Sequence, residues 1–140
     1  MEKPFVCNSA IVLEWEGFIY FHPKNDENNI LAARFDADPR NPPLFPAGEE
    51  LYGRLELDDV TLARQVDTAA PSHVSQADDS IDEHNTEVTG TVVGVNPKWH
   101  EAQVKVEGFP VEITVHDKCV EGLDVGSHVM LVGDLIFCYE

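Results

Sequence analysis

The sequence predicts an all-β protein whose C-terminal half is a small five-stranded barrel of the OB-like or SH3-like type. Short runs of Val, Ile and Thr recur between residues 86 and 140, and turn residues separate them at nearly even spacing. A segment of about 55 residues is too short for two well-covered sheets, whereas a barrel leaves few unpaired strand edges. These observations favour a barrel over a sandwich.

The first half of the chain also carries strand patterns. Strand patterns begin at residue 5: residues 11–16 alternate, an apolar run follows at 18–21, and alternation returns at 31–36 after a polar turn segment. Four prolines make residues 36–47 an irregular loop. Leu51, Leu55 and Leu57 then share one face, and residues 60–66 form either a strand or a short helix, with strand favoured. We therefore expect a second β unit similar to the C-terminal one.

Residues 67–85 differ in composition from both halves. They contain five acidic residues, no Lys or Arg, and few side chains that could anchor a core. The expected organisation is an N-terminal β unit over residues 1–66, an acidic flexible linker over 67–85, and a C-terminal barrel over 86–140. Matching glycines at 17 and 90 and at 48 and 126, with Pro-Lys at 23 and 97, suggest a weak internal repeat. The alternative is one continuous domain.

Five C-terminal runs are the expected strands of the barrel. In the second and third runs Val104, Val106, Ile113 and Val115 point inward, because they alternate with polar residues. Gly133 and Asp134 suit a two-residue hairpin between the fourth and fifth runs. At most one helical turn fits between residues 116 and 127. The five runs are residues 87–95, 103–107, 111–116, 128–132 and 135–139.

The charge of the chain is the strongest indication of function. It has 26 acidic and 9 basic residues and a net charge of −17, which repels phosphate backbones and anionic lipid and favours basic protein surfaces. We expect a non-enzymatic module that docks on a basic protein, with direct nucleic acid and membrane contact disfavoured. In composition alone the chain resembles small inhibitors of phages and mobile elements that mimic DNA. The candidate partner-binding residues are Asp78, Asp79, Asp82, Glu83, Glu101, Glu107 and Glu112.

An oligonucleotide-binding barrel is the alternative. Lys98 and Trp99 lie in a loop between two predicted strands, and Lys105 follows in the next strand. Cations beside an aromatic ring are the groups on which single-stranded nucleic acids stack. The competing interpretation is a tryptophan that covers one end of the barrel beside solvated lysines.

An enzyme of unknown reaction is the third interpretation, since none of the common catalytic or nucleotide-binding motifs occurs. His116 and Cys119 form a close pair without the second pair of a structural zinc site, so neither metal nor cofactor is predicted. Three cysteines without framework spacing, and an N-terminus unlike a signal peptide, favour the cytoplasm. No apolar run reaches the ~20 residues of a membrane span. Unpaired edge strands would allow a homodimer.

Overall fold

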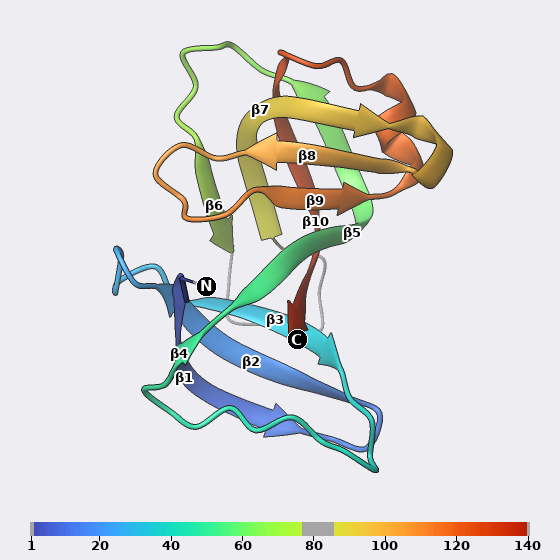
Figure 1. Cartoon of the computed structure of the whole chain (residues 1–140). Coiled ribbons are helices and arrows are strands. Elements are labelled where there is room, and N and C mark those ends of the chain that lie inside the picture. Colours follow the sequence, from blue (N-terminus) through green and yellow to red (C-terminus); the bar gives the residue numbers. More distant parts are fainter. Residues whose placement is uncertain (1, 77–85, 140) are drawn as a thin grey trace.

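The chain is all-β, as predicted. The computed structural model describes residues 2–76 and 86–139. Two short 3-10 helices, η1 (Pro97–Trp99) and η2 (Lys118–Gly122), are the helices of the described residues. The strands are β1 (Phe5–Val12), β2 (Glu16–Pro23), β3 (Leu31–Asp36), β4 (Glu50–Leu51), β5 (Gly53–Gln65), β6 (His73–Gln76), β7 (Thr86–Asn96), β8 (Glu101–Lys105), β9 (Ile113–His116) and β10 (His128–Tyr139) (Figure 1).

The strands form two barrels that share β5 and β10. In the C-terminal barrel the order is β7, β8, β9, β5 and β10, and pairing of β10 with β7 closes the ring. In the N-terminal barrel β1, β2 and β3 continue into β10 and β5, while β4, which leads into β5, pairs with β1. Figure 1 shows the two groups of strands one above the other, with β5 and β10 running through both. The five-stranded C-terminal barrel and the similar N-terminal unit are both confirmed.

The predicted hairpin at Gly133 and Asp134 is wrong, because β10 runs without a turn from His128 to Tyr139. A side chain at position 133 would place its Cβ 2.7 Å from the carbonyl oxygen of Asp58 on the neighbouring strand. Strand register shifts at the same point, between Val132 and Asp134. The glycine therefore permits a close approach of two backbones inside a strand instead of a reversal.

The fifth strand of the C-terminal barrel comes from the first half of the chain. Leu55–Asp58 of β5 pair in parallel with Ile113–His116 of β9. The strand interpretation of residues 60–66 is correct as far as Gln65, and β5 continues through Asp59, which has a φ of 48°. Pairing therefore crosses the boundary expected at residue 66.

Part of the predicted flexible linker is a strand. His73–Gln76 form β6, which pairs antiparallel with Thr86–Thr89 of β7. Val74 is 3% exposed and belongs to the core, so it supplies an apolar anchor that the polar composition of the segment hid. Residues 77–85 lie outside the described residues.

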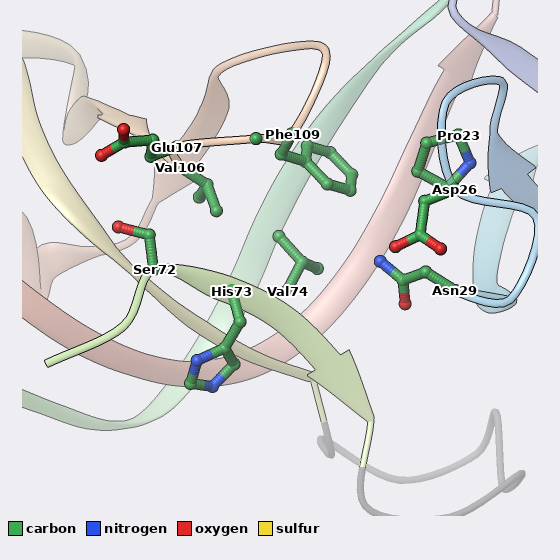
Figure 2. Close-up of a pocket in the computed structure, with 10 residues that line it drawn as sticks. Pro23, Asp26, Asn29, Ser72, His73, Val74, Val106, Glu107 and Phe109 are labelled. Carbon is green, nitrogen blue, oxygen red and sulfur yellow. The ribbon is translucent and has the colours of Figure 1, made fainter.

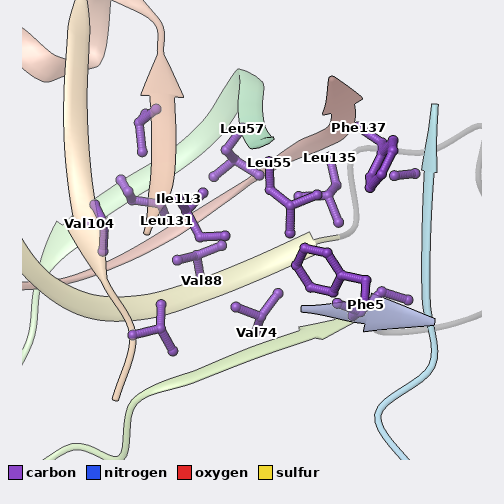
Figure 3. Packing of buried hydrophobic residues seen from close by; sticks show 14 of the residues in the cluster. Phe5, Leu55, Leu57, Val74, Val88, Val104, Ile113, Leu131, Leu135 and Phe137 are labelled. Atoms are coloured by element: carbon purple, nitrogen blue, oxygen red, sulfur yellow. The ribbon is translucent and has the colours of Figure 1, made fainter. Parts of the chain in front are cut away.

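A single hydrophobic core runs through both barrels. Val104, Ile113 and Val115 are 0% exposed and Val106 is 2% exposed, which confirms the predicted inward face. Phe5, Phe21 and Phe137 fill the N-terminal barrel and join the same cluster. Figure 3 shows Val104 and Ile113 at one side, with Leu55, Leu135 and Phe137 continuing toward the other barrel. Each barrel is thus packed against the other through the strands they share.

The two barrels repeat one local structure. Gly48 has a φ of 86° and its N–H donates to the carbonyl of Cys7 at 2.7 Å. Gly126 has a φ of 92° and donates in the same way to Val92 at 2.8 Å. Both positions need a left-handed backbone, which glycine adopts at low cost. Gly17 and Gly90 are not equivalent, since Gly17 pairs with Val12 whereas Gly90 pairs with Val129.

Candidate functional site

Three neighbouring hollows meet at Ser72 and Glu107, and together they form what we call the Glu107 groove. Their volumes are about 250, 330 and 370 Å³. The first lies between the barrels, and the other two follow the segment before β6 and the outer side of β7. The groove is therefore formed by three parts of the chain that are far apart in sequence.

The first hollow has an apolar centre and polar ends. Figure 2 shows Val74, Val106 and Phe109 around its centre, with Asp26 at one end of the view and Glu107 at the other. The loop that carries Asp26 is held against the opposite barrel, because the side-chain amide of Asn25 donates to the carbonyl of Gly108 at 3.3 Å. This contact links the loop that carries Asp26 to the turn that follows Glu107.

His73 contacts a third carboxylate near the groove. Its Nδ1 lies 3.2 Å from the carbonyl oxygen of Pro71, and its Nε2 contacts the Glu87 carboxylate. The ring therefore lies between a backbone carbonyl and a carboxylate. In Figure 2 the ring points away from Val106 and Phe109. Glu87 is thus occupied by an internal partner.

Asp26 and Glu107 take part in no ion pair among the described residues. Both residues are exposed. Lys105 lines the 370 Å³ hollow, and no other lysine is among the described residues that line the groove. The groove therefore presents two carboxylates on either side of an apolar centre.

The structure separates the predicted acidic residues. Glu107 lies in the groove, and Glu112 is exposed just before β9 at the same end of the β8–β9 pair. Glu101 begins β8 at the opposite end, where it is half-buried and pairs across the sheet with His116. Asp78, Asp79, Asp82 and Glu83 lie outside the described residues.

The predicted nucleic-acid-binding residues are also not together. Trp99 is 60% exposed, and the Lys98 ammonium lies 5.5 Å from the centre of its ring. Lys105 is at the other end of β8, whose five residues span roughly 15 Å. Lys98 and Trp99 therefore lie together, whereas Lys105 lines the groove.

Sequence reasoning missed Asp26, Ser72 and Val74. Asp26 stands in a polar turn segment and Ser72 in the predicted linker, and neither segment carries a pattern beyond turn or coil. The groove exists only because the β2–β3 loop, β6 and the turn after β8 meet. Their proximity depends on barrel pairing, which a local pattern does not encode.

The cysteines offer little chemistry. Burial, followed by the charge of Asp117, raises the pKa of Cys119 to about 11, and burial together with Glu56 raises that of Cys138 to about 11. Both thiols are therefore protonated near neutral pH and are weak nucleophiles. Within residues 2–76 and 86–139, no three His, Cys, Asp or Glu side chains lie close enough together to hold a metal ion. The pair His116 and Cys119 is therefore not part of such a group.

No helix in the described part of the chain has the length and apolar character needed to cross a membrane.

Comparison with known proteins identifies a fold and no family. No protein-family model matches the chain, and no curated protein matches it. A solved structure of the cytoplasmic molybdate-binding protein ModG, with molybdate bound, matches with a TM-score of 0.50 and 16% sequence identity over 97% of this chain and 93% of that one. The match extends over both barrels, and it supports the OB-like assignment of the fold.

Proposed function

We propose that this protein is a non-enzymatic binding module that docks on a basic protein surface, and that the Glu107 groove receives a basic segment of the partner. The observation that carries the proposal is the pair of carboxylates, Asp26 and Glu107, on either side of the apolar centre of the groove. A segment with Lys or Arg on each side of an apolar residue matches this order of groups.

The net charge supports the same partner. At −17 the chain attracts a basic surface over several ångströms, which raises association rates and disfavours anionic ligands. The apolar centre at Val74, Val106 and Phe109 would contribute affinity that charge alone does not. Inhibition of a nucleic-acid-binding partner by occupying its basic groove is the mechanism we favour, because carboxylates can stand where phosphates would lie.

Molybdate binding is not transferred from the structural neighbour. The likeness rests on 16% identity, and an oxyanion would meet two carboxylates in the Glu107 groove. The charge of this chain opposes such a ligand.

Removal of the two groove carboxylates tests the proposal. The variant Asp26→Asn/Glu107→Gln should bind a peptide with the core Arg-Leu-Arg at least about tenfold more weakly, since two charge contacts are lost. Binding is measured by titration calorimetry at low and at physiological salt, and affinity for the parent should fall as salt rises.

The matched control is Glu14→Gln/Glu16→Gln, which makes the same change in charge at exposed positions on the β1–β2 hairpin. This control should bind nearly as well as the parent. Equal losses in the two variants would mean that the peptide responds to net charge and that the groove is not the site.

Oligonucleotide binding is the second candidate, because Trp99 is 60% exposed with a lysine beside its ring. It predicts that oligothymidine quenches tryptophan fluorescence and that Trp99→Ala abolishes the quenching. Quenching that survives in Asp26→Asn/Glu107→Gln, with no peptide bound by the parent, would replace the first proposal by the second.

A further inference from the structure

A separate hollow lies beside β4 in the N-terminal barrel and shares no lining residue with the Glu107 groove. Its volume is about 320 Å³, and the aromatic side chains of Phe45, Tyr52 and Tyr139 line it together with Glu49 and Glu50. Three aromatic rings line this hollow, whereas Phe109 alone supplies a phenyl ring to the described lining of the Glu107 groove.

Two of the three rings are held in place by the core. The rings of Phe45 and Tyr139 stand 5.4 Å apart at 83°, so they form a corner. Phe35 packs on Tyr139 at 5.8 Å and Phe137 packs on Phe45 at 6.0 Å, both at nearly right angles. Phe35 and Phe137 are each 1% exposed. The corner is therefore formed before any ligand arrives, which lowers the entropy cost of binding.

The two carboxylates differ in their availability. Glu50 accepts a hydrogen bond from the Lys24 ammonium at 2.7 Å. Glu49 is in no ion pair among the described residues, and its backbone is fixed because its carbonyl accepts from the N–H of Cys7 at 2.9 Å. Its negative charge, after burial, also contributes to the raised pKa of the Cys7 thiol. Lys3, the cation of the lining, is exposed.

We propose that this aromatic pocket binds an organic cation, an alkylammonium or guanidinium group, against the rings of Phe45, Tyr52 and Tyr139 and beside the Glu49 carboxylate. The face of an aromatic ring carries negative charge density and attracts cations within ~6 Å of its centre. An anion would be repelled by Glu49, while Lys24 compensates the charge of Glu50. A neutral apolar ligand would strip water from those carboxylates without replacing the lost interactions. A pocket of about 320 Å³ accommodates such a group.

The cation could be a free molecule or the end of an Arg or Lys side chain of another protein, and two probes distinguish these sources. Choline represents the free cation and Nα-acetyl-arginine methylamide represents the side chain. The uncharged analogue of choline, 3,3-dimethyl-1-butanol, has the same shape without the charge. Backbone amide shifts of Glu49, Tyr52 and Tyr139 in 1H–15N spectra report binding at this site.

At least one cation should shift these amides in a saturable way, and 3,3-dimethyl-1-butanol should bind more weakly by tenfold or more. Tighter binding of choline assigns a free ligand, and tighter binding of the arginine derivative assigns a protein side chain. Glu49→Gln should weaken the cation about three- to tenfold, as expected for one partly exposed carboxylate. The variant keeps the backbone contacts of residue 49, and circular dichroism checks its fold.

Glu14→Gln is the matched control, because it removes one charge at an exposed position that lines neither this pocket nor the Glu107 groove. It should leave the affinity unchanged within twofold, and Tyr52→Leu should weaken binding without a change in charge. Equal binding of choline and its neutral analogue would overturn the proposal, as would equal losses in Glu49→Gln and Glu14→Gln or no saturable shift with either cation.

Discussion

Asp58 shows how the shared strands place a carboxyl group in an unfavourable position. Burial, and after it the negative charge of Glu56, raise its pKa from 3.8 to about 6, with smaller effects of Asp59 and Asp134 in the same direction and of His116 in the opposite one. One carboxyl oxygen, Oδ1, is buried without a hydrogen-bond partner. Asp58 lies opposite Asp134 in the β5–β10 pair, so the two barrels meet where two acids face each other.

A raised carboxyl pKa makes stability fall as pH rises. Between pH 3.8 and about 6 the folded state holds a proton on Asp58 that the unfolded state has released. The contribution of this group to the free energy of unfolding is complete below pH 3.8, decreases as the pH rises, and is lost above about pH 6. Asp58→Asn should therefore stabilise the protein by about 1–2 kcal/mol at pH 7.5, after allowance for partial exposure, and have little effect at pH 4. Urea unfolding at the two pH values measures this. A gain that is the same at both pH values, or a loss at pH 7.5, would contradict it.

Single-residue patterns were predictable where they depend on neighbours in the chain. Val104 and Ile113 face inward because alternation is a property of one strand, and both are 0% exposed. Gly133 was misread because a glycine is suited both to a turn and to a close approach of two strands. The atom that approaches it is the carbonyl oxygen of Asp58, which is 75 positions away in the sequence. Glu107 was identified by its charge alone. Asp26 could not be, since nothing local distinguishes it from other turn acids.

At the scale of elements, β6 is joined to the N-terminal barrel by one side chain. The Gln76 amide accepts from the backbone N–H of Ala32 at 2.8 Å and donates to the carbonyl of Ala32 at 2.7 Å. It also donates to the hydroxyl of Thr86 at 2.9 Å. The side chain thus supplies both hydrogen bonds that a neighbouring strand would offer to β3. β6, which pairs with β7 outside the C-terminal ring, thereby covers part of β3 in the N-terminal barrel.

Gln76→Leu should cost about 1–3 kcal/mol, because the backbone groups of Ala32, a buried residue, lose their partners. The neighbouring Ser75→Ala changes an exposed side chain and should cost less than about 0.5 kcal/mol. Urea unfolding gives both values, and hydrogen exchange at the Ala32 amide should be faster in Gln76→Leu alone. Unchanged protection of that amide would show that the Gln76 contacts do not hold β6 against β3.

Strand existence was easier to predict than strand partners. The runs that became β7, β8 and β9 are visible in the sequence because each alternates or is bounded by turn residues. The parallel pairing of Leu55–Asp58 with Ile113–His116 joins residues 58 apart and leaves no local trace. For that reason the fold class followed from the sequence, while the exchange of strands between the barrels did not.

At the scale of the whole molecule, each barrel is completed by a strand from the other half of the chain. β9 pairs with β5 in the C-terminal barrel, and β3 pairs with β10 in the N-terminal one, both in parallel. β5 and β10 also pair with each other over almost their full length. The core is one cluster. Unfolding of one barrel would therefore expose the open edges and apolar side chains of the other, and the two should unfold together.

Cutting the chain after residue 66 tests this dependence. The fragment 67–140 lacks β5, so β9 and β10 lose their common neighbour and Ile113 and Leu131, each 0% exposed in the full chain, become accessible. The fragment 1–66 lacks β10 and the core residue Phe137. We expect each fragment alone to give the circular dichroism and poorly dispersed NMR spectra of an unfolded chain. An equimolar mixture should recover the spectrum of the intact protein, because β5 and β10 can then pair, and the intact chain should unfold in a single transition. A well-dispersed spectrum from fragment 67–140 alone would show that the C-terminal barrel folds without its fifth strand and that the boundary at residue 66 separates independent domains.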